Sequence, residues 1–141
     1  MADKVDFNIR CVVVTSPTEI LYARSKRKMD TYKINLNFYR NYHYTKNNKI
    51  KKMYMNMMEP QLKGVRFNNP IDIIFRLQKK DRRRLDRSNI LSIVEKYFCD
   101  ALVHHGCIDD DNDNFIRRTI YETGRTNNED QHVEIIITEV R

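Results

Sequence analysis

The chain has 141 residues, of which 32% are charged, and its formal net charge at pH 7 is +7. This length fits one domain with a real core, and the scarcity of glycine and proline, three of each, argues against a disordered tail. The longest apolar runs, such as Val12 to Val14, are too short to cross a bilayer. The basic charge favours a polyanionic partner, either nucleic acid or an acidic membrane surface.

The first six residues, Met-Ala-Asp-Lys-Val-Asp, lack the apolar core that a secretion signal needs. Cys11, Cys99 and Cys107 are an odd number of cysteines without metal-type pairing, which suits a reducing compartment. We therefore expect a cytoplasmic protein without a membrane partner. Abundant Asn, Lys and Ile suggest an AT-rich genome, such as that of a bacteriophage or a mobile element.

Alternating apolar residues predict a strand from Phe7 to Val13, which Ser16-Pro17 ends, and a second strand from Tyr32 to Phe38. Residues 18–30 between them are ambiguous. Their basic cluster suggests a loop: Arg24, Lys26, Arg27 and Lys28.

The spacing of apolar residues predicts a helix over 50–57, which Pro60 and Gly64 end. After a clean strand at 71–77, the strongest helical stripe of the chain covers 90–102 and stops at Gly106. Two further strands are expected, at 115–121 and 133–140, with a polar turn between them.

This order of elements, β-β-α-β-α-β-β, points to a single α+β domain over residues 1–141. We expect a mixed sheet of about four to five strands, with the two main helices packed on one face.

Acidic side chains stand at both ends of the helix expected over 90–102: Asp86 before it and Asp109 to Asp111 after it. Two carboxylates about 4 Å apart repel by about 4 kcal/mol at an effective dielectric near 20. If the fold brings Asp86 to the others, a hard divalent cation is expected to hold them. The simpler interpretation is that Asp86 or Ser88 only caps the helix, which is worth about 1 kcal/mol.

Basic residues outnumber acidic ones by seven to two between Arg76 and Arg87. Beside a candidate metal site, such a run is expected to contact phosphates, although a solvated charged face is the alternative. The residues that we expect to bind DNA here are Lys79, Lys80, Arg82, Arg83, Arg84 and Arg87. A zinc site at His104, His105 and Cys107 is disfavoured because their spacing matches no structural zinc pattern.

A set of short motifs appears in a defined order. Leu85-Asp86-Arg87-Ser88-Asn89 is followed by Lys96, then Asp100-Ala101-Leu102, Gly106 and Asp110-Asp111. In this the chain resembles the RusA-type Holliday junction resolvases, in which an Asp-x-Asp-Asn element opens a helix with a lysine and an Asp-Ala-Leu, and an Asp-Asp pair begins the next strand. The segment from Ile34 to Asn41 is also similar to an early Asn-containing segment of that family. The resemblance covers roughly residues 32 to 121.

The resemblance implies a homodimer that cuts branched double-stranded DNA, Holliday junctions, in recombination and repair. Mg²⁺ is the implied cofactor, with Mn²⁺ as a substitute. Asp86 and Asp111 would be catalytic metal ligands with Asp110 beside them, and the catalytic Lys96 would act near the scissile phosphate. Asn37 and Arg40 are matched to the DNA-binding segment upstream.

Ser88 stands where the family usually has its second aspartate, which removes one negative ligand. A catalytically weak or inactive junction-binding protein is therefore an alternative interpretation. A third is an RNA- or DNA-binding module in which the acidic loop is only a turn.

Overall fold

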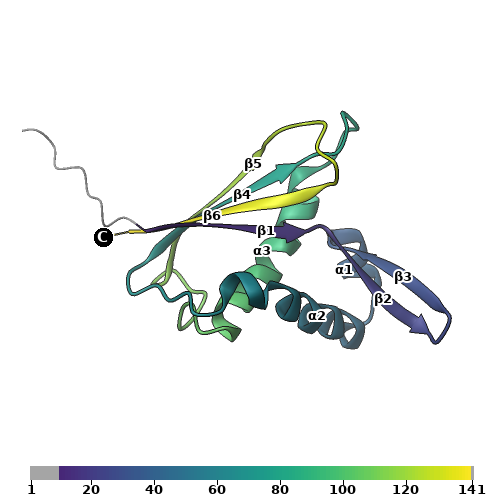
Figure 1. Ribbon diagram of the computed structural model, residues 1–141, viewed down its shortest axis with the longest axis horizontal. Coiled ribbons are helices and arrows are strands. Elements are labelled where there is room, and N and C mark those ends of the chain that lie inside the picture. The colour runs from purple at the N-terminus through teal and green to yellow at the C-terminus, as the bar shows by residue number, and fades with distance from the viewer. Residues whose placement is uncertain (1–9, 141) are drawn as a thin grey trace, which may run out of the picture.

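The computed structural model describes residues 10–140 and has an α+β architecture (Figure 1). The elements are β1 (Cys11–Pro17), β2 (Glu19–Ser25), β3 (Lys28–Lys33), α1 (Leu36–Asn41), α2 (Tyr44–Leu62), β4 (Ile71–Gln78), α3 (Arg87–His104), β5 (Ile116–Thr123) and β6 (His132–Glu139). Four strands form a mixed sheet in the order β1-β6-β4-β5, and β2 and β3 form a separate hairpin. The expected α+β class and mixed sheet are confirmed.

The direction of the strands decides where the loops of the sheet lie. β4 pairs with β6 antiparallel and with β5 parallel, so α3 is the crossover between two strands that run the same way. Ile71 pairs with Ile116 where β4 and β5 begin, and Leu77 pairs with Thr123 near their ends. The segment before β5 and the segment after β4 therefore lie at opposite ends of the sheet.

The core lies between the sheet and the two long helices, α2 and α3, which lie on one side of it (Figure 1). Alternate residues of β4, Ile71, Ile73, Phe75 and Leu77, are buried against these helices because successive strand residues face opposite ways. None of the helices in residues 10–140 is both long and apolar enough to cross a membrane.

The expected first strand exists as β1, but its buried face differs from the one that its pattern suggested. Val14 and Ser16 are buried, whereas Cys11 and Val13 are exposed. The apolar residues at 12–14 place apolar side chains on both faces of β1. Alternation alone therefore could not show which face of β1 is buried. Phe7 and Ile9 lie outside the described residues.

The strand expected over 32–38 is wrong beyond Lys33, where β3 ends. Asn35 caps α1 instead, since its Oδ1 accepts a hydrogen bond from the Phe38 backbone N–H at 2.9 Å. The loop expected within 18–30 is a hairpin, β2–β3. Its inner face, with Ile20, Tyr22 and Tyr32, is buried in the core.

Candidate nucleic-acid interface

Asp86 is the N-cap of α3. Its backbone is extended, and its Oδ1 accepts a hydrogen bond from the backbone N–H of Asn89 at 3.4 Å. Such a bond satisfies one of the free N–H groups with which every helix begins. The expected capping role is thus observed for Asp86, whereas Ser88 lies exposed in the first turn of α3.

A cavity of about 550 Å³ opens at this end of α3. It lies between the loop that follows β4, the junction of β1 and β2, and the turn between β5 and β6. Its charged lining residues carry both signs: Glu19, Lys33, Lys80, Asp81, Arg83, Asp86 and Asp130. The N-terminus of a helix contributes partial positive charge, so this is the most favourable place on α3 for an anionic group.

Asn89 joins two helix starts at this cavity. Its Oδ1 accepts a hydrogen bond from the Leu36 backbone N–H at 3.1 Å, which fixes the beginning of α1 beside the first turn of α3. Asn35, the cap of α1, lines the cavity as well. The predicted DNA-binding residues Asn37 and Arg40 follow on α1, where both side chains are exposed.

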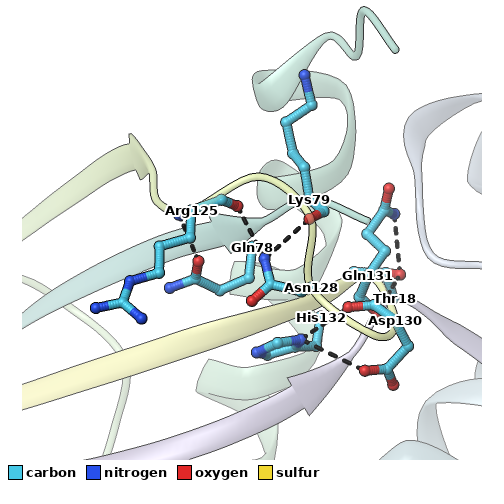
Figure 2. A network of polar contacts seen from close by, with 8 residues as sticks. All are labelled: Thr18, Gln78, Lys79, Arg125, Asn128, Asp130, Gln131 and His132. Carbon is cyan, nitrogen blue, oxygen red and sulfur yellow. Dashed lines mark hydrogen bonds and ion pairs between the residues drawn. The ribbon is translucent and has the colours of Figure 1, made fainter. Parts of the chain in front are cut away.

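The basic loop is defined as residues 79–87, which follow β4 and end at the first residue of α3. A polar network fastens the base of this loop to the turn between β5 and β6 (Figure 2). The Asn128 Nδ2 donates hydrogen bonds to the carbonyl oxygens of Lys79 and Arg125, both at 2.9 Å. Gln78 Oε1 accepts from the Arg125 backbone N–H at 2.6 Å. The Lys79 side chain extends away from this network (Figure 2), so its backbone is held while its ammonium group stays available.

The cations of the loop are not neutralised by carboxylates. Among the ion pairs of residues 10–140, none involves a predicted DNA-binding side chain of this loop: Lys79, Lys80, Arg82, Arg83, Arg84 or Arg87. Arg87 Nη1 donates to the Thr123 hydroxyl at 3.2 Å, which holds it against the end of β5. These charges are therefore available to an external anion.

Two of the three consecutive aspartates after α3, Asp109 and Asp110, have polar partners in the structure. Asp109 forms an ion pair with Arg66 at 2.7 Å. Asp110 accepts hydrogen bonds within its own loop, from the Asp111 backbone N–H at 2.8 Å and from Asn112 Nδ2 at 3.0 Å. These contacts reduce the repulsion that Asp109 and Asp110 experience from the neighbouring carboxylates.

Asp111 lines a second cavity, of about 230 Å³, beside the middle of α3. Most of its lining is polar or acidic: Glu95, Lys96, Cys99, Asp100, Asp111, Asp113 and Thr119. Asp100 also forms an ion pair with Lys51 of α2 at 3.3 Å. Burial raises the pKa of the Cys99 thiol, and the nearby carboxylates, that of Glu95 first, raise it further. The raised pKa favours the protonated thiol over the thiolate.

The structure brings two of the predicted catalytic residues together and leaves the third apart. Lys96 and Asp111 line the second cavity, whereas Asp86 lines the first. α3 has 18 residues and is about 27 Å long, and Lys96 lies about 15 Å along it from Asp86.

The structure therefore does not bring Asp86 together with Asp110 and Asp111 within a single chain. The cause is the parallel pairing of β4 and β5, which places their preceding and following loops at opposite ends of the sheet. Within residues 10–140, no group of three or more Asp, Glu, His and Cys side chains is arranged to hold a metal ion.

Several residues that line the first cavity were not expected from the sequence. Asp130 and Gln131 reach it from a turn that carries no motif, and Lys33 reaches it from the base of the hairpin. Asn35 could have been found, because an asparagine directly before a short apolar stretch is a common helix cap.

No protein-family model matches the chain, and no curated protein matches it significantly. The similarity to the RusA-type resolvases therefore rests on the order and spacing of the motif residues alone.

Proposed function

We propose that the protein binds branched double-stranded DNA through the basic loop at residues 79–87 and the N-terminus of α3. The observation that carries this proposal is the unpaired cationic cluster of that loop, held on a fixed base beside a helix N-terminus. Basic side chains and helix N-termini are the groups with which proteins most often bind phosphate oxygens. The preference for a branch comes from the resemblance to junction resolvases.

Competition binding tests this proposal. A labelled four-way junction is displaced by an unlabelled junction, by a linear duplex of the same sequence and by double-stranded RNA, in the presence of EDTA. We expect the junction to compete best and the RNA worst. Equal competition by linear duplex would remove the branch from the proposal, and stronger competition by RNA would favour an RNA-binding module.

Metal-dependent phosphodiester hydrolysis is a second candidate function. The observation that favours it is the acidic second cavity, which unites Asp111 with Lys96 and adds Glu95, Asp100 and Asp113. The arrangement of these carboxylates in the chain is not that of a formed Mg²⁺ site, and Ser88 supplies no acidic ligand at the start of α3.

Cleavage of a synthetic four-way junction with Mg²⁺, and with EDTA as the control, tests the second candidate. If the second cavity is the active site, Asp111→Asn abolishes cleavage and Asp86→Asn leaves most of it. If both variants cut as fast as the parent, neither carboxylate belongs to an active site. If the parent does not cut at all, the DNA-binding function remains alone.

We also propose that the protein binds DNA as a homodimer that is formed through the uncovered face of the sheet. One apolar row crosses all four strands on the side opposite the helices, because Val13 pairs with Ile136, Ile136 with Ile74, and Ile74 with Ile120. Val13 is 60% exposed and Ile120 is 38% exposed.

Charged residues border this row on both sides. Arg76 forms ion pairs with Glu122 and, at 2.7 Å, with Glu134 on one side, and Asp72 pairs with Arg117 at 2.6 Å on the other. A two-fold axis that runs along the row would pack the row of one chain on the same row of a second copy. The border with Glu122 and Glu134, which is the more acidic one, would then face the border with Asp72 and Arg117 of the second copy.

A further inference from the structure

The β2–β3 hairpin projects from the body of the protein, beyond α1 and α2 (Figure 1). Only its inner face is packed, since Ile20, Tyr22 and Tyr32 are buried. The hairpin is a two-stranded sheet of its own, so both of its long edges are free of strand partners in residues 10–140. The tip and the outer face of the hairpin therefore do not pack on the core and are accessible to a partner.

The tip of the hairpin is strongly basic. Four of five consecutive residues from Arg24 to Lys28 are cationic, and all five are exposed. Among the ion pairs of the described chain, none involves any of these four cations. Clustered like charges without counter-charges raise the free energy of the isolated protein, and a polyanion would relieve that repulsion.

The outer face of the hairpin is apolar near this tip. Leu21 is 62% exposed and Met29 is 65% exposed. Ala23 pairs directly with Met29 in the register of the hairpin, so Leu21, Ala23 and Met29 point to the same side. A ribbon with an apolar face and a cationic end suits the major groove of a duplex, which is about 12 Å wide and lined by thymine methyl groups and phosphates.

The hairpin starts at the cavity that the basic loop also borders. Glu19 and Lys33, which pair at the base of the ribbon, line this cavity together with Arg83. Six residues of strand from Glu19 reach about 20 Å, the length of about six base pairs of duplex. The tip can therefore contact the same duplex as the loop, half a helical turn away.

We propose that the β2–β3 hairpin is a DNA-binding arm, whose tip cations bind backbone phosphates while its outer face lies in the major groove. This inference rests on the proposed DNA-binding function and extends its footprint along one arm of the junction. The unpaired cations argue for DNA as the occupant of this surface over a second copy of this basic chain.

Hydroxyl-radical footprinting and equilibrium binding on a four-way junction test the arm. The variant Lys26→Gln/Arg27→Gln removes two tip charges. As the matched control, Lys52→Gln/Lys63→Gln removes two exposed charges, one in α2 and one at its C-cap. We expect the tip variant to shorten the protected stretch by about six base pairs and to lower the salt slope of binding by about 1.8, while the control changes neither. Leu21→Ser/Met29→Ser is expected to weaken binding with an unchanged slope, because it removes no charge.

The outcomes separate the arm from the function on which it rests. If the parent protects no DNA, the proposed function itself fails. If the parent protects DNA and the tip variant keeps the full footprint and slope, the arm is overturned. The arm is also overturned if the tip variant changes the sedimentation of the free protein, or its binding to phosphatidylglycerol vesicles, and leaves the footprint intact.

Discussion

The carboxylate of Asp86 caps the N-terminus of α3. We expect Asp86→Ala to lower the free energy of unfolding by about 1 kcal/mol, because an N-cap hydrogen bond is lost. Asp86→Asn keeps an acceptor oxygen at the same place and is expected to cost much less. Urea denaturation at neutral pH measures both changes, and equal losses for the two variants would contradict the capping role.

The three cysteine thiols should differ sharply in reactivity. Cys11 is exposed, whereas Cys99 and Cys107 are buried, and burial raises the pKa of both buried thiols. A raised pKa lowers the thiolate fraction at pH 8, and burial also blocks access to reagents. Titration with a thiol-specific disulfide reagent is expected to modify one thiol rapidly in the native protein and all three in urea. Rapid modification of two thiols in the native protein would contradict this expectation.

At the level of single residues, the sequence shows which acidic side chains are candidates for a site more readily than it shows which groups they contact. An aspartate before a helix has the same signature whether it caps the helix or binds a metal, and Asp86 is the cap. Asp109 looks like part of an acidic cluster, but Arg66, more than forty residues away, neutralises it. Such long-range partners leave no trace in local spacing.

The end of α3 depends on the backbone of Gly106, whose φ is +74°. A Cβ at this position would contact nothing within 4 Å, so Gly106→Ala would bring only the strain of the left-handed conformation. We expect it to lower the free energy of unfolding by about 1 kcal/mol, and Gly106→Asn to cost less because asparagine tolerates this conformation. Thermal and urea unfolding measure the difference. A larger loss for Gly106→Asn than for Gly106→Ala would contradict this explanation.

At the level of elements, β4, α3 and β6 could be predicted because their apolar periodicity is strong and each lies in the core. The hairpin was missed because basic residues at its tip interrupt the alternation of Ile20 and Tyr22. α1 was missed because Ile34 and Leu36 continue the alternation of β3 past its end, although Asn35 between them begins a helix. Whether β5 runs parallel or antiparallel to β4 is a property of the whole sheet, and it separates Asp86 from Asp111.

The whole molecule carries an apolar row on the uncovered face of its sheet, and this row is the basis of the proposed dimer. We expect Ile120→Lys to shift the sedimentation coefficient from that of a dimer to that of a monomer, because the row would have to bury a charge in the interface. Lys63→Gln, at an exposed position away from the sheet, is the control. A monomeric parent, or a variant that remains dimeric, would contradict this interface.

We propose above all that the loop at residues 79–87 binds the DNA backbone, and this contact determines how strongly binding depends on salt. The affinity for a four-way junction is measured over a range of salt concentrations for the parent and for Arg82→Gln/Arg83→Gln/Arg84→Gln. Each phosphate contact that is lost lowers the slope of log affinity against log salt concentration by about 0.9, so we predict a decrease of about 2 to 3. A slope equal to that of the parent would contradict the claim and exclude this loop from the interface.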